Sequence, residues 1–171
     1  KLELKLTGNE EGINKKYTDS NEAYQLYLRG RYHWSRRTRD DILKAIDNYK
    51  KAIEIDPNFA LAYAATAETY NSMGKNPDVP PKDCIPLAKA AATRALEIDP
   101  TLAQAHSALA DSLALYDWDW AMSEHHFKKA IEFDPNIAYT YVAYGASYLG
   151  PVGRADEAVV QLERAVTLEP S

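Results

Sequence analysis

Residues 115–126 hold side chains that could do chemistry: two Trp, two Asp, one Glu and two adjacent His. Such residues can bind a metal or move a proton. Neighbouring helical positions point about 100° apart, so His125 and His126 do not share a helix face. Chelation from one face needs spacing near i,i+4, and no ligand residue lies four positions from either histidine. The pattern therefore predicts packed or solvated histidines, with no metal and no cofactor.

The aromatic part of this segment allows two interpretations. In the first, Asp119 caps a helix while the rings of Trp118 and Trp120 cover the end of a helix pair. In the second, the two rings form a platform on which Asp117 and Asp119 recognise a cation. We favour the first. Elsewhere the lone Cys84 follows Asp83, whose charge raises rather than lowers a thiol pKa, so no nucleophile arrangement is visible and no catalysis is expected.

Composition restricts the classes of partner. The chain has 171 residues and a net charge of −5, divided into +4 over residues 1–51 and −9 over residues 52–171. An acidic body argues against nucleic-acid binding, and no stretch is apolar enough to predict membrane contact. The basic cluster Arg36, Arg37 and Arg39 is followed directly by two aspartates, which predicts a solvated turn. The sequence does not distinguish a cytoplasmic from a periplasmic location. Because the first residue is Lys rather than Met, we expect the chain to be a piece of a longer protein.

The elements that position these side chains follow from a repeat. The strings "KKAIEIDP", "TRALEIDP", "KKAIEFDP" and "ERAVTLEP" end at prolines separated by 43, 35 and 35 residues. Small residues recur upstream at helical spacing, so each unit predicts two antiparallel helices with close backbone contacts. Asp56, Asp99 and Asp134 are expected to N-cap the helix that follows. The positions that define the repeat are Gly30, Ala45, Ala52, Pro57, Ala67, Ala88, Ala95, Pro100, Ala110, Ala130, Pro135, Gly145, Ala158, Ala165 and Pro170.

This pattern resembles the tetratricopeptide repeat (TPR) family. The resemblance implies an all-α, right-handed superhelix of antiparallel helix pairs, with about four repeats in residues 17–171. The expected repeats cover 17–57, 58–100 with an insertion at 72–83, 101–135 and 136–170, after a linker or domain tail at 1–16. In the insertion, Asp83 is expected to cap the next helix and Pro86 to lie in its first turn.

A narrower resemblance concerns the place of the array in a larger protein. "YTDSNEAYQLYLRGRYHWSRRT", "PPKDCIPLAKAAATRALEIDP" and "YDWDWAMSEHHFKKAIEFDP" are similar to C-terminal TPR arrays of bacterial multidomain regulators. In those proteins the array follows a serine/threonine kinase or a winged-helix domain, often with a TolB-like segment between. The resemblance implies a bacterial signalling context.

In TPR proteins the first helices line a concave face that binds peptides. The matching positions in this chain form a candidate peptide groove: Tyr24, Tyr27, Arg31, Leu61, Glu68, Asn71, Gln104, Ser107, Asp111, Tyr139 and Val142. Of the Lys/Asn/Arg clamp that holds chaperone C-termini in this family, only Arg31 has a counterpart, so that ligand is not expected. Glu68 and Asp111 favour a basic or neutral extended segment.

The sequence therefore predicts a non-catalytic protein-interaction module whose partner is a protein or peptide segment. One alternative is a self-associating structural spacer. The last helix is expected to expose an apolar flank, including some of Val159, Leu162 and Val166, which further repeats or another copy would cover. A second alternative is a metal-dependent enzyme that uses residues 115–126.

Overall fold

A computed structural model describes residues 17–169, and these residues are all-α without any strand. The expectations for residues 1–16 and for Pro170 lie outside this range. α6 and α8 each continue into a π-helical stretch, η1 and η2. The elements are α2 (Asn21–Ser35), α3 (Arg39–Ile55), α4 (Ala60–Gly74), α5 (Pro81–Ile98), α6 (Ala103–Ser112), η1 (Leu113–Asp117), α7 (Trp120–Phe133), α8 (Ala138–Ala143), η2 (Tyr144–Leu149) and α9 (Ala155–Leu168).

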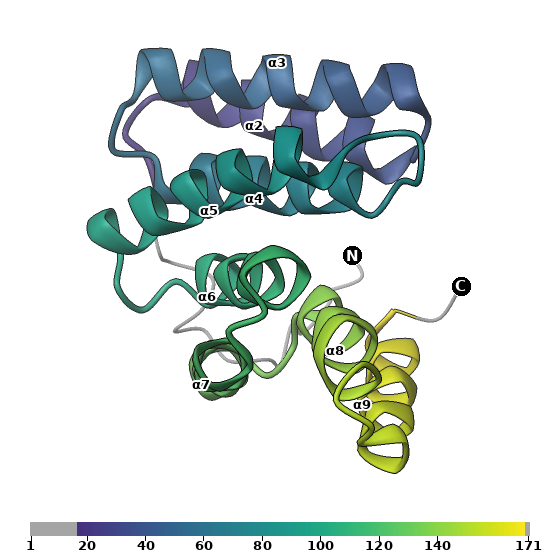
Figure 1. The fold of residues 1–171 in the computed structure, drawn as a ribbon. Helices are drawn as coiled ribbons and strands as arrows, with labels where there is room; N and C mark the ends of the chain where they lie inside the picture. The colour runs from purple at the N-terminus through teal and green to yellow at the C-terminus, as the bar shows by residue number, and fades with distance from the viewer. Residues whose placement is uncertain (1–16, 170–171) are drawn as a thin grey trace, which may run out of the picture.

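The helices pack as successive pairs: α2 with α3, α4 with α5, α6 with α7, and α8 with α9. Each pair also packs on the next, and the pairs rotate along the array. In Figure 1 the first two pairs lie across the view, whereas α6 and α7 are seen nearly end-on. The all-α stack of helix pairs that the repeat predicted is confirmed. Within the described residues, no helix is both long and apolar enough to span a bilayer.

Small residues lie where the helices approach most closely. Ala45, Ala52 and Ala95 have no exposed surface. At Gly30 an added Cβ would lie 2.6 Å from Cδ1 of the buried Tyr49 and closer still to Cε1, so α2 and α3 could not keep this distance with any larger residue. The repeated small positions therefore set the spacing within the pairs.

The prediction that the Asp-Pro aspartates N-cap the next helix is wrong. Asp56 instead follows the last residue of α3, and its Oδ1 accepts a hydrogen bond from the Asn58 amide at 3.0 Å. Asp99 and Asp134 make the same bond to the amide two residues ahead, at 3.1 and 2.9 Å. This local side-chain turn satisfies the backbone on its own, so the next helix starts later. The three following helices begin at Ala60, Ala103 and Ala138.

The insertion expected at residues 72–83 is only partly non-helical. Its non-helical part is residues 75–80, because α4 continues to Gly74 and α5 begins at Pro81. Asp83 is not the N-cap, since it lies in the first turn and its amide donates to the Pro80 carbonyl at 3.0 Å. Pro86 consequently falls in the second turn rather than the first. Pro81 starts the helix because its fixed φ suits the first helical position.

Candidate functional site

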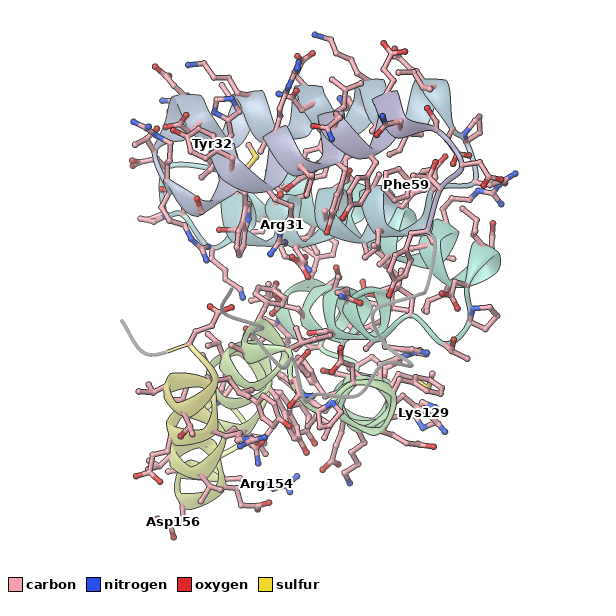
Figure 2. All side chains as sticks on the ribbon, turned by 180° about the vertical axis from the view of Figure 1, so that it is seen from behind. Arg31, Tyr32, Phe59, Lys129, Arg154 and Asp156 are labelled. Carbon is pink, nitrogen blue, oxygen red and sulfur yellow. The ribbon has the colours of Figure 1, made fainter. Side chains whose placement is uncertain are left out.

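A groove of about 600 Å³ runs along the first helices of the pairs and ends against α9. Side chains from all four pairs contribute to its walls. We call it the concave groove, and its lining residues are Tyr27, Arg31, Trp34, Arg37, Glu68, Ser72, Lys75, Gln104, Asn136, Ile137, Ala138, Tyr139, Val142, Leu162, Ala165, Val166 and Glu169. In Figure 2, Arg31 lies on the side of α2 that faces the later pairs.

The structure brings six of the eleven predicted groove residues to this wall: Tyr27, Arg31, Glu68, Gln104, Tyr139 and Val142. Tyr24 is exposed beside the groove and stacks on Tyr27, with ring centroids 6.1 Å apart. The remaining predicted residues lie deeper.

Four predicted groove residues are buried beneath the wall: Leu61, Asn71, Ser107 and Asp111. The Asn71 amide donates to the Ala108 carbonyl at 2.8 Å and accepts from the Ser112 hydroxyl at 2.9 Å, so it joins α4 to α6. These side chains hold the helices together and do not line the groove.

The two acidic side chains expected to attract a basic ligand already have cationic partners. Glu68 pairs with Arg31 at 2.9 Å and Asp111 with Lys75 at 2.8 Å. Burial raises the pKa of Glu68, and the adjacent Arg31 opposes that shift. The expectation of a basic ligand therefore loses its support, because neither carboxylate offers the groove an uncompensated charge.

Asp111 also joins the third pair to the fourth. Its Oδ2 accepts from the Tyr139 hydroxyl at 2.7 Å as well as from Lys75. The Lys75 ammonium lies 5.8 Å from the centroid of the Tyr139 ring. Burial, followed by the charge of Asp111, raises the pKa of Tyr139 well above its ordinary value. This network fixes the floor of the groove across three repeats.

Trp34 and Arg37 line the concave groove although the sequence did not indicate them. Trp34 is 8% exposed, and its ring meets that of Tyr139 edge-on at 6.4 Å. The guanidinium carbons of Arg31 and Arg37 lie 4.8 and 3.7 Å from the Trp34 ring centroid. Residues 27, 31 and 34 share one helix face, and that spacing was the available signal for Trp34.

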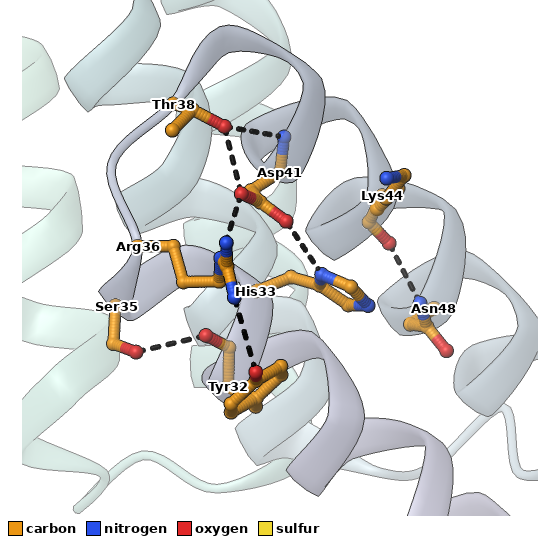
Figure 3. A network of polar contacts seen from close by, with 8 residues as sticks. All are labelled: Tyr32, His33, Ser35, Arg36, Thr38, Asp41, Lys44 and Asn48. Carbon is orange, nitrogen blue, oxygen red and sulfur yellow. Dashed lines mark hydrogen bonds and ion pairs between the residues drawn. The ribbon is translucent and has the colours of Figure 1, made fainter.

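The turn between α2 and α3 holds Arg37 in place. Asp41 accepts from Thr38 Oγ1 at 2.7 Å, Arg36 Nε at 3.0 Å and His33 Nδ1 at 2.8 Å (Figure 3). Hydrogen bonds, first from His33 and then from Thr38, lower the pKa of Asp41 to about 2. Arg36, Arg37 and Arg39 are all exposed, as the prediction of a solvated turn requires, and the closed turn directs the Arg37 side chain onto Trp34.

The segment 115–126 is structural in most of its length. Asp119 caps α7 as predicted, because its Oδ1 accepts from the Met122 amide at 3.1 Å. Trp120 packs against Tyr148, with ring centroids 6.1 Å apart. Trp118 is 70% exposed with φ of +55°, so the prediction that both indoles cover the helix ends is wrong for this residue. The αL conformation that closes η1 turns its ring outward.

The histidines meet in a way that spacing along one helix could not reveal. His106 Nδ1 lies 2.8 Å from His126 Nδ1, and His106 Nε2 lies 2.9 Å from the Pro100 carbonyl. A carbonyl only accepts, so His106 donates through Nε2 and receives a bond from His126. Within residues 17–169, no three His, Cys, Asp or Glu side chains gather as metal ligands. Cys84 is buried, and burial with the charge of Asp83 raises its pKa.

The stacked pairs and their concave groove define a helical-repeat solenoid. A family model described as "TPR repeat" matches residues 39–74. A search of the curated proteins finds no match. The arrangement of the helix pairs is that of a tetratricopeptide repeat array, and the family model matches part of it.

Solved structures share this fold at low sequence identity. A thermophilic TPR protein of Thermus thermophilus matches with a TM-score of 0.67 and 21% identity, over 88% of this chain and 76% of that one. PilW, a type IV pilus biogenesis factor, matches with 0.63 and 20%, over 88% and 64%. The first TPR of Spaghetti (RPAP3), bound to an HSP90 peptide, matches with 0.57 and 16%, over 92% and 100%. The predicted TPR superhelix is thereby confirmed.

Proposed function

We propose that this chain is a non-catalytic protein-interaction module that holds an extended protein segment in the concave groove. The supporting observation is the groove itself, about 600 Å³ in volume, with aromatic, aliphatic and charged side chains from all four pairs. Solenoids present such concave faces to partners. The TPR domain of Spaghetti (RPAP3) has an HSP90 peptide bound.

The test is selection of short random peptides displayed on phage against the folded chain. Selected peptides should lose about tenfold or more in affinity with Val142→Arg, because this substitution places a long charged side chain in the groove. Val160→Arg is the matched control, since Val160 is also an exposed valine but lies outside the groove lining. Failure to select any peptide, or equal losses with both variants, would refute the proposal.

We further propose that the array belongs to a larger bacterial signalling protein. The three strings that resemble regulator arrays support this context. The coding sequence upstream of Lys1 tests it: a kinase or winged-helix domain is the expected finding, and an unrelated domain would contradict it.

Self-association is the second candidate function, and the exposed face of α9 favours it. Val159, Leu162 and Val166 are 53%, 38% and 65% exposed at helical spacing, as the sequence predicted. A second copy would bury this stripe. Sedimentation at increasing concentration should then show dimers or larger species that Val159→Glu abolishes, whereas a monomer at all concentrations would exclude this function.

A further inference from the structure

Arg37 has an unusual backbone conformation for its residue type. Its φ is +58°, in the left-handed region that an L-residue with a side chain adopts at a cost. Such strain persists where the surrounding structure enforces it, and it concentrates at functional positions. At Arg37 the consequence is specific: the guanidinium lies 3.7 Å from the Trp34 ring centroid and lines the concave groove.

Among the cations of residues 17–169 that line the groove, Arg37 alone has no carboxylate partner. Arg31 is balanced by Glu68, and Lys75 by Asp111. No ion pair joins Arg37 to a carboxylate among residues 17–169, although its charge, like that of Arg31, opposes the burial that raises the pKa of Glu68. An anionic group in the groove would therefore meet a cation that is already positioned.

Trp34, which also lines the groove, carries a hydrogen-bond donor that is unpaired within residues 17–169. Its Nε1 is buried and has no acceptor among the described residues. A buried N–H without an acceptor is unfavourable, and a ligand oxygen would relieve that cost. A guanidinium stacked on an indole keeps its N–H groups in its own plane, where they suit the two oxygens of a carboxylate.

Apolar side chains adjoin this polar corner. The Tyr139 ring contacts Trp34, and Val142 on α8 lines the groove together with Leu162 and Val166 of α9. The lining thus offers a cationic end beside an aliphatic stretch. A segment that carries an acidic residue next to a large apolar residue complements both.

We propose that Arg37 and Trp34 form the recognition site for an Asp or Glu side chain of the bound segment, with the adjacent aliphatic wall receiving a neighbouring apolar side chain. This rests on the proposed function, because it names the partner chemistry of the same groove. It differs from the expectation of a basic ligand, since the structure neutralises Glu68 and Asp111 within the protein and leaves Arg37 for the ligand.

The test uses the peptides selected from the random phage library, synthesised and titrated by calorimetry against the whole chain. They should share an Asp or Glu beside a large apolar residue. Arg37→Gln should weaken binding roughly ten- to hundredfold, as expected for the loss of a charge-assisted hydrogen bond. Arg39→Gln removes the same charge from an exposed position outside the groove, and its affinity should stay within about twofold.

A double-mutant cycle separates direct recognition from a change in the turn. Replacing the acidic peptide residue by Asn or Gln should weaken binding to the natural chain but not to Arg37→Gln. Arg37→Gly keeps the αL backbone without strain, so it should fold normally and yet bind as weakly as Arg37→Gln.

Two results overturn the proposal and leave groove binding intact: selected peptides without a shared acidic residue, or affinities that do not respond to Arg37→Gln. A library that yields no peptide sensitive to Val142→Arg would instead refute the proposed function, and this inference with it.

Discussion

The Lys75–Asp111 pair should be a main source of stability for the concave groove. Asp111 has no exposed surface, and its Oδ2 receives hydrogen bonds from Lys75 at 2.8 Å and Tyr139 at 2.7 Å. Lys75→Met preserves the aliphatic stem but removes the ammonium, leaving the buried carboxylate with the phenol alone. Breaking a buried pair costs about 3–5 kcal/mol. The Lys75 side chain is 35% exposed, so we expect about 2 kcal/mol after solvent screening.

Urea unfolding followed by circular dichroism measures this loss. With a slope of about 2 kcal/mol per molar urea, the midpoint should fall by about 1 M. Lys82→Met is the matched control, because Lys82 is an exposed lysine in the first turn of α5, and its midpoint should change little. In an Asp111→Asn background, Lys75→Met should cost less than about 0.5 kcal/mol, because no charge remains to be compensated.

The reasoning would be refuted by a Lys75→Met midpoint equal to that of the natural chain at an unchanged slope. Additive losses in the Lys75→Met, Asp111→Asn double variant would also refute it. Either result would mean that solvent replaces the ammonium without cost.

Three further predictions concern single positions. Gly30→Ala should lower the unfolding free energy by about 1–3 kcal/mol, because its Cβ would clash with the Tyr49 ring; an unchanged melting temperature would contradict this. Burial lowers the pKa of His126 to about 4 and also lowers that of His106. Between pH 6.5 and pH 4 the unfolded chain therefore binds more protons than the folded chain, and the free energy of unfolding decreases as the pH is lowered. For His126 we expect the free energy of unfolding to decrease by about 1–2 kcal/mol over this range after solvent screening, and this contribution should be absent in His126→Gln. Urea titrations that show the same acid sensitivity for both chains would disprove the prediction. Trp118→Gly should stabilise by up to about 1 kcal/mol, since φ is +55° and the ring is mostly exposed, whereas a lower melting temperature would show that the indole makes needed contacts.

The repeat made the fold predictable because each repeated position has one physical role. Ala52, Ala95 and Ala130 occur at the same place before each Asp-Pro pair, and all three are fully buried. The error at the aspartates came from a competing local interaction. A side chain able to cap a helix can also bond the amide two residues ahead, and proline immediately after the aspartate does not decide between the two.

The groove was only partly predictable because repeat positions say nothing of helix ends. Arg31 and Glu68 were found from their positions on the first helices. Arg37 and Lys75 come just after those helices, outside the positions that the repeat marks, and both line the groove. The same limit explains the contact between His106 and His126, which lie on partner helices 20 residues apart in sequence.

The contact between Trp34 and Tyr139 makes the groove a property of the whole array. In a solenoid each repeat mainly contacts its neighbours, yet here the first pair touches the fourth. The position of Tyr139 depends on Asp111 of the third pair, and Asp111 depends on Lys75 of the second. The width of the groove at Trp34 is therefore coupled to all four repeats.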